Sequence, residues 1–347
     1  MSTASTAVTS VAHGTATTRT SLLRRLLLSR EAGIALAFLL VVGVTTARNP
    51  LFLFSPDGFR DLLLTPSILV VVAVGQAVVI ITRNVDLSVG SIVGLTAYLT
   101  GTLFTTTALP IPVVMLAGVV FGALLGAVNG ALVALGRVPA MVITLGTLYA
   151  FRGINVAWTG SSRINASDLP PAFLGMGTHQ LWGLPVLTLI ALVVLGSVGW
   201  YLANTRPGRE FYAIGSAPDA AGLYGLPARR RVFTAFVLSG ALSGLGGVLY
   251  AARYGTVSSQ AGFGFELQAI GAAVIGGVAI VGGVGTVLGA AIGAFLLLTI
   301  SRALPVLGIP DLWQQALVGA LIIGAIVLDR VLAQRQTRRL SEGRADA

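Results

Sequence analysis

Long apolar segments alternate with short polar ones along nearly the whole chain. About 20 consecutive apolar residues cross a bilayer as a helix, and by that measure the pattern predicts ten spans. The predicted spans run near 32–48, 62–82, 87–106, 111–135, 139–158, 182–203, 232–251, 266–283, 285–303 and 311–329. Only a glycine-rich turn separates the eighth from the ninth, so these two can form a re-entrant pair. We therefore expect an all-α polytopic membrane protein in which some helices are broken or re-entrant.

The sharpest interruption lies at residues 82–86, between the second and third predicted spans. Arg83 and Asp86 stand there with strongly apolar residues on both sides. Charges so close to hydrocarbon are costly and tend to sit in protein-lined or water-lined places. We expect a helix that breaks, turns tightly and re-enters, with Asp86 near the start of the next helix, where a carboxylate suits the helix dipole. For Asp86 alone, an ordinary capped helix start is the simpler explanation.

The composition agrees with a membrane protein and excludes several kinds of site. Of 347 residues, 55% are hydrophobic and 10% are charged, and the mean hydropathy is +0.90, whereas a soluble domain carries roughly 25% charged residues. There is no cysteine, which excludes disulfides and zinc–thiolate sites. The two histidines, His13 and His179, lie far apart in polar segments. We expect no metal and no cofactor.

The charges predict the orientation of the chain. All 22 basic residues are arginines, and the net charge is +10. With the N-terminus in the cytoplasm, most arginines, including those at 229–231, fall in inner segments, as the positive-inside rule requires. The first apolar run has no convincing cleavage site and is expected to be retained. We expect a disordered tail over 1–30, a transmembrane domain over 31–330 and a second tail over 331–347, with both termini cytoplasmic.

The long inner loop at 204–231 predicts a contact with a partner. Pro218 and Asp219 precede a short run that reads as a capped helix, which Gly225 and Pro227 stop. A short helix with exposed apolar residues can dock in a groove of another protein. A solvated loop that lies on the membrane surface is the alternative.

No motif for enzyme chemistry is present. A phosphate-binding loop needs lysine, which this chain lacks, and neither His-Glu-x-x-His nor Gly-x-Ser-x-Gly occurs. We therefore do not expect this chain to hydrolyse ATP itself. Asp86, Glu266, Asp311 and Asp329 fall at predicted span ends, which argues against an ion-coupled carrier, because such carriers use carboxylates inside the spans. The candidate residues for a translocation path are Gln76, Asp86, Asn129, Thr144, Asn155 and Gln268, although each is more simply a helix–helix hydrogen bond.

The run at 82–91 reads Thr-Arg-Asn-Val-Asp-Leu-Ser-Val-Gly-Ser. It resembles the signature of the ribose-type sugar permeases of bacterial ATP-binding cassette (ABC) importers. The similarity continues at 129–130, 137–140, 144–148, 152–153, 208–216 and 275–289, and it covers roughly residues 32–329. Residues 82–84, 158–160 and 309–313 look most like the autoinducer-2 and rhamnose branch.

The resemblance implies a permease of the bacterial inner membrane. Two permease chains, identical or homologous, would form the path, two cytoplasmic ATP-binding subunits would dock on the inner loops, and an extracytoplasmic binding protein would deliver a sugar or sugar-like solute. The implied ATPase-coupling residues are Gly208, Glu210, Gly215, Ala220, Ala221 and Gly225. The alternatives are an ABC permease for another small solute, such as branched-chain amino acids, an ion-coupled secondary carrier, and a membrane scaffold or receptor that carries no solute.

Overall fold

The structure, a computed structural model, describes residues 30–136, 138–310, 312–321, 323–324 and 327. These residues are mostly helical, which confirms the all-α prediction. The predicted tails lie outside the described residues, apart from Arg30. The elements are α2 (Arg30–Arg48), α3 (Leu51–Phe54), α4 (Pro56–Ile81), α5 (Val89–Thr106), α6 (Ile111–Gly136), α7 (Ala140–Thr159), η1 (Ala166–Asp168), α8 (Pro171–Met176), β1 (Gln180–Leu181), β2 (Leu184–Pro185), α9 (Val186–Asn204), α10 (Arg206–Ser216), α11 (Pro218–Leu223), α12 (Ala228–Tyr254), α13 (Phe265–Ile275) and α14 (Val287–Val306).

Eight of the described helices are long and apolar enough to cross a membrane, and they correspond to the first seven predicted spans and the ninth. The eighth prediction, 266–283, is wrong in extent. Helix α13 stops at Ile275, and residues 276–286 are not helical. Gly277, with φ 85°, turns the chain there into the left-handed region, which glycine enters without strain. The tenth prediction is helical at 313–321, and several of its later residues lie outside the described part.

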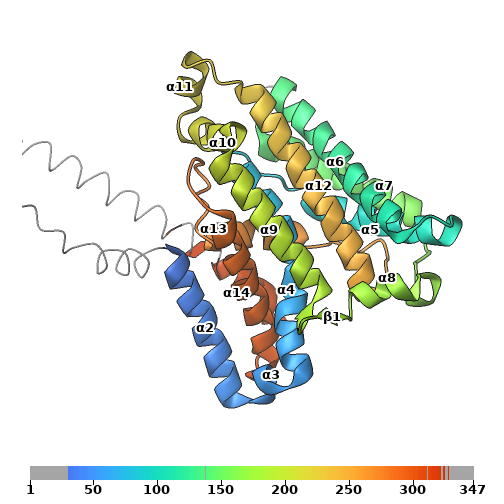
Figure 1. Ribbon diagram of the computed structural model, residues 1–347. Helices are drawn as coiled ribbons and strands as arrows, with labels where there is room; N and C mark the ends of the chain where they lie inside the picture. Colours follow the sequence, from blue (N-terminus) through green and yellow to red (C-terminus); the bar gives the residue numbers. More distant parts are fainter. Residues whose placement is uncertain (1–29, 137, 311, 322, 325–326, 328–347) are drawn as a thin grey trace, which may run out of the picture.

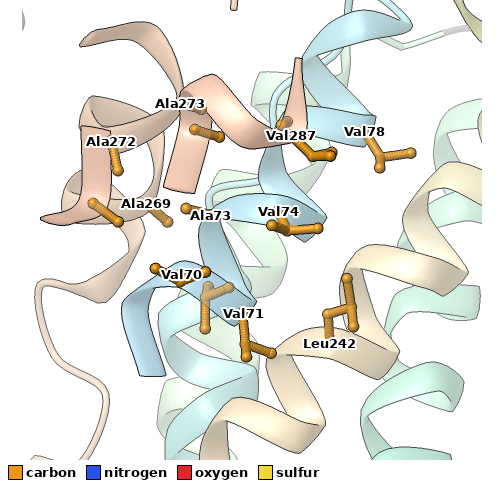
Figure 2. Close-up of a cluster of buried hydrophobic side chains, with 14 of the residues drawn as sticks. Val70, Val71, Ala73, Val74, Val78, Leu242, Ala269, Ala272, Ala273 and Val287 are labelled. Carbon is orange, nitrogen blue, oxygen red and sulfur yellow. The ribbon is translucent and has the colours of Figure 1, made fainter. Parts of the chain in front are cut away.

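Helix α4 forms the centre of the bundle. It packs against α9, α12, α13 and α14, and 94% of its most apolar stretch is buried, against 11% for α2. A helix that is apolar on every face belongs in an interior of this kind. Figure 2 shows valines of α4 facing alanines of α13, Val287 of α14 and Leu242 of α12. Helix α4 is therefore enclosed by several neighbouring helices.

A seam of glycines joins α6 to α12. A Cβ atom on Gly122 would lie 2.6 Å from Gly244 Cα, and one on Gly240 would lie 2.6 Å from Gly126 Cα. Small residues at four-residue spacing let two helix backbones approach this closely in a membrane. The remaining surface of α6 and α7 is largely exposed and apolar, as expected of the side that faces lipid or another membrane chain.

Replacing Gly122 with valine should destabilise the protein. The new side chain would overlap the backbone of α12, and overpacking of this kind costs about 1–3 kcal/mol. The matched control is Gly146→Val on the exposed face of α7, where a Cβ meets nothing within 4 Å. Thermal unfolding in detergent should show a drop of several degrees for the first variant and little change for the second. Equal melting temperatures would contradict this packing.

The bundle has two different ends. Helices α10 and α11 lie together at one end, and α3, α8 and the β1–β2 hairpin lie toward the opposite end (Figure 1). Helices α4 and α12 run the length of the bundle between these ends, and α10 contacts both of them. The break at residues 82–88 follows α4 at the α10–α11 end (Figure 1).

Candidate translocation and coupling site

Helix α4 ends in a hydrogen-bonded turn that uses an arginine where glycine is usual. The Arg83 N–H donates to the Ile80 carbonyl oxygen at 2.8 Å, and the Asn84 N–H donates to that of Val79 at 3.3 Å. This is the Schellman pattern, which requires one left-handed residue, and Arg83 takes it with φ 66°. The predicted break is therefore a defined helix stop.

The chain re-enters through a turn built by Asp86. Its Oδ1 accepts hydrogen bonds from the Ser88 N–H at 2.9 Å and from Ser88 Oγ at 2.7 Å, and α5 begins at Val89. Gln76 of α4 pairs with the backbone of Asp86. Its amide nitrogen donates to the Asp86 carbonyl oxygen at 3.1 Å, and its amide oxygen accepts from the Asp86 N–H at 3.2 Å. The Gln76 side chain thus pairs with the N–H and the carbonyl oxygen of Asp86 as a neighbouring peptide group would. These two backbone groups lie outside the helices and gain hydrogen-bond partners in this way.

Two further helices close around the same turn. Asn129 of α6 donates to Ser88 Oγ at 2.7 Å, and Thr144 of α7 donates to the Val85 carbonyl oxygen at 3.2 Å. The structure therefore brings four of the six path candidates together. Gln76, Asp86, Asn129 and Thr144 each have 0% of their surface exposed. In this conformation they enclose and brace the break.

The cluster is not fully paired. Asp86 Oδ2 and Asn129 Oδ1 are buried and have no hydrogen-bond partner among the described residues. A buried polar atom without a partner costs about 1–3 kcal/mol. The turn is therefore less stable than a fully bonded one.

The other two path candidates lie elsewhere. Asn155 of α7 is buried and donates to the Ser259 carbonyl oxygen at 3.2 Å. Gln268 is half-buried in α13. Both are near the loop that precedes α13, away from the turn at Asp86.

The inner loop folds into two helices, of which α11 was predicted and α10 was not. Thr205 begins α10 by accepting a hydrogen bond from the Gly208 N–H at 3.1 Å. Glu210 is buried and is bonded by Arg231 at 2.5 Å and by Arg206 at 3.0 Å. These hydrogen bonds, that of Arg231 above all, hold the pKa of the Glu210 carboxyl below its ordinary value. Glu210 therefore stays ionised at neutral pH and ties α10 to the start of α12.

Most of the remaining predicted coupling residues determine where α11 ends or lie on the inner side of α10 and α11. Gly225, with φ 71°, ends α11 in another Schellman turn, in which the Leu226 N–H donates to the Ala221 carbonyl oxygen at 3.0 Å. Ala221 and Gly208 are buried, and Ala220 is half-buried. Leu223 and Tyr224 lie on the outer surface of this loop, where they are 89% and 85% exposed.

Helix α10 is seated directly on the end of α4. Gly215 lies against the Ile81 carbonyl oxygen, and that oxygen accepts a hydrogen bond from the Gly283 N–H at 2.9 Å. Tyr212 donates its hydroxyl hydrogen to the Gly285 carbonyl oxygen at 3.0 Å. One junction therefore joins α10, the end of α4 and the loop between α13 and α14. Two peptide bonds separate Ile81 from Arg83, where the break begins.

Sequence reasoning missed this junction and most of α10. A threonine followed two residues later by proline and then by the glycine at 208 is a recognisable helix start, so α10 had a local signal. The junction had none, because it joins backbone atoms at 81, 215 and 283 that no local pattern connects.

Comparisons with known proteins agree with this arrangement. A family model described as branched-chain amino acid transport system / permease component matches residues 59–326. The autoinducer 2 import system permease protein LsrC of Enterobacter sp. (strain 638) is 38% identical over 316 residues, which are 91% of each chain. The protein of the same name from Klebsiella pneumoniae is 36% identical over the same shares, and that of Escherichia coli K12 is 36% identical over 78% of this chain and 80% of its own. No solved structure matches.

The matched region begins in α4 and includes α10, α11 and the break at 82–88. It therefore includes both parts of the candidate site. A multi-pass helical membrane protein with this coverage is a transport subunit and not an enzyme, and the chain belongs to the branched-chain amino acid transport system / permease component family.

Proposed function

We propose that this chain is the permease of an ABC importer that carries autoinducer-2 or a related monosaccharide across the bacterial inner membrane. The observation that carries the proposal is the similarity to the autoinducer 2 import permeases over 91% of both chains. Because the similarity extends through the break at 82–88 and through α10 and α11, it includes the parts that would move solute and receive energy.

Helices α10 and α11 are the proposed docking element for an ATP-binding subunit. They stand at one end of the bundle (Figure 1) and carry exposed apolar side chains at Leu223 and Tyr224. Their loop is rich in arginine, and by the positive-inside rule this supports a cytoplasmic location for this end. The opposite end would then receive solute from an extracytoplasmic binding protein, and a second permease chain would complete the path.

The junction at Ile81 supplies the proposed route for coupling. A docked subunit that pulls on α10 moves Gly215 and Tyr212, which contact the end of α4 and the loop at 283–285. The break at 82–88 follows immediately, so its enclosed cluster is the proposed switch between inward-facing and outward-facing states. Alternating access by rigid movement of packed helices needs a joint of this kind.

Reconstitution tests the function. The permease, the ATP-binding subunit and the binding protein encoded beside it would be placed in liposomes with labelled autoinducer-2, rhamnose, ribose or leucine. We expect ATP-dependent uptake of autoinducer-2 or one of the sugars. Uptake of leucine instead would favour the second candidate, a branched-chain amino acid permease, which the description of the family model supports. Uptake driven by a proton or sodium gradient without ATP would overturn the proposal.

Replacing Leu223 and Tyr224 together with serine should weaken binding of the ATP-binding subunit at least tenfold. Apolar side chains with such high exposure contribute little to folding, but they contribute binding energy when a partner buries them. The matched control is Trp182→Ser, because Trp182 is 89% exposed near the β1–β2 hairpin. Co-purification and affinity measurements in nanodiscs check the result. Unchanged binding in the double variant would contradict docking at α11.

A further inference from the structure

The loop between α12 and α13, residues 255–264, lies closely against α5. Gly94 and Gly90 of α5 make room for it. A Cβ on Gly94 would overlap the Ala261 carbonyl oxygen, and a Cβ on Gly90 would lie 2.6 Å from the Gly262 carbonyl oxygen. The loop backbone therefore occupies space that side chains of α5 would otherwise fill.

Two side chains of α7 also hold the loop. Arg152 Nη1 donates to the Ala261 carbonyl oxygen at 2.9 Å, and Asn155 Nδ2 donates to that of Ser259 at 3.2 Å. The guanidinium carbon of Arg152 lies 5.6 Å from the centroid of the Phe263 ring, within the range of a cation–π contact. Because 67% of the Phe263 side chain is exposed, the ring offers a free aromatic surface beside a cation.

Glu266 adds a carboxylate to the same place. Its Oε1 accepts a hydrogen bond from the Gly264 N–H at 3.3 Å, and its Oε2 lies so close to Gly90 that a Cβ there would overlap it. The carboxylate attracts the Arg152 cation electrostatically. Arg152 lies within α7, a helix long enough to cross a membrane, and a charge in such a helix is costly and usually serves a function.

Each of three side chains here has one buried polar atom left without a hydrogen bond in the described part of the protein. They are Arg152 Nη2, Asn155 Oδ1 and Glu266 Oε2. Asn155 is 0% exposed. A role in holding the loop accounts for the partner of Arg152 Nη1 and that of Asn155 Nδ2, but it leaves these three atoms unexplained. One unpaired donor beside two unpaired acceptors is the complement of a hydroxylated molecule, because a hydroxyl both donates and accepts.

The three side chains gather around one loop. Glu266 Oε2 lies within overlap distance of a Cβ placed on Gly90, and the Asn155 amide nitrogen lies 3.1 Å from the Cβ position of Gly94. Gly90 and Gly94 are about one helical turn apart, or roughly 6 Å at 1.5 Å per residue. Arg152 and Asn155 face the same side of α7, because residues three apart on a helix are neighbours. These groups therefore come from neighbouring turns of α5 and α7 and from the start of α13.

We propose that Arg152, Asn155, Phe263 and Glu266 form a solute-contact site of the translocation path for a neutral polyhydroxylated ring, an inference that rests on the proposed function. One ring hydroxyl accepts from Arg152 Nη2, and others donate to Glu266 Oε2 and Asn155 Oδ1. The Phe263 ring covers the apolar C–H face of the solute. A small number of placed polar groups beside an aromatic surface is the usual composition of a small-molecule site.

The test uses the complete complex in liposomes with Glu266→Gln and Phe263→Leu. Glutamine keeps an oxygen for the Gly264 N–H, and leucine keeps apolar bulk at an exposed position, so folding is preserved. The matched control is Tyr149→Leu, on the exposed face of α7. Three quantities are measured: the melting temperature, ATP hydrolysis stimulated by the loaded binding protein, and uptake of whichever probe among labelled autoinducer-2, rhamnose and ribose the unaltered complex carries.

We expect uptake per ATP hydrolysed to fall at least tenfold in both variants, with the melting temperature and stimulated hydrolysis unchanged, and no effect in the control. Wild-type uptake in both variants would overturn the site and leave the proposed function intact. A lower melting temperature together with a loss of stimulated ATP hydrolysis would also overturn the proposed site, because that result would show that the residues are needed for folding. If the unaltered complex carries none of the three probes, the proposed function itself fails, and the site fails with it.

Discussion

Replacing Gly215 with valine should uncouple ATP hydrolysis from transport. A Cβ at this position would overlap the Ile81 carbonyl oxygen and lie 2.6 Å from the Gly283 N, so α10 must move away from the end of α4. Overpacking at a tight site costs about 1–3 kcal/mol, and 1.4 kcal/mol corresponds to a factor of about ten in an equilibrium. We expect uptake in proteoliposomes to fall about tenfold or more, while the ATP-binding subunit still binds.

Gly196 provides the control for this prediction. It lies in α9, outside the proposed docking element, and a Cβ there meets nothing within 4 Å. Gly196→Val should therefore leave both uptake and hydrolysis near the level of the unaltered complex. Normal uptake by Gly215→Val would show that the junction at Ile81 does not transmit the movement of α10.

The sequence predicted the spans well because the bilayer imposes a length. A helix that crosses hydrocarbon needs about 20 apolar residues, and this requirement is visible without tertiary contacts. It explains the agreement between the predicted span at 111–135 and α6 at Ile111–Gly136. The requirement fails for α13, because residues 276–283 are apolar and glycine-rich but leave the helix through left-handed glycines.

The candidate site was only partly predictable. The pattern at 82–86 identified a break, since two charges interrupt an apolar run, but it could not indicate which residues brace that break. Gln76 reaches Asp86 across one helix end, and Asn129 and Thr144 arrive from α6 and α7. Four residues that were selected only as polar candidates thus turn out to share one buried cluster.

The inner loop at 204–231 was also only partly predictable from the sequence. Its aromatic and apolar residues indicated a docking surface, but the sequence did not separate inward from outward positions. Glu210 and Phe211 are buried, whereas Leu223 and Tyr224 are exposed. The period of a short helix is poorly defined over so few residues, and the direction of each side chain depends on Arg231 and Ile81, which are distant in sequence.

Two substitutions of Asp86 separate the effect of its negative charge from the effect of the turn that it builds. In Asp86→Ala, the Ser88 N–H and Oγ lose their acceptor. Each buried group left without a partner costs about 1–3 kcal/mol, so the melting temperature in detergent should fall markedly and uptake should be lost. In Asp86→Asn, the side-chain oxygen still accepts both bonds, and the new amide nitrogen replaces an oxygen that has no partner. This variant should therefore fold and transport nearly as well as the unaltered protein.

Ser88→Ala tests whether the hydrogen bonds of the turn account for the loss of stability. It removes the hydroxyl that joins Asp86 to Asn129 but keeps the bond from the backbone N–H to Asp86. We therefore expect a loss of stability between those of the Asn and Ala variants at residue 86. A different result would assign the carboxylate another role: if Asp86→Asn folds normally but carries no solute, the negative charge itself, and not the turn that it builds, is what transport requires.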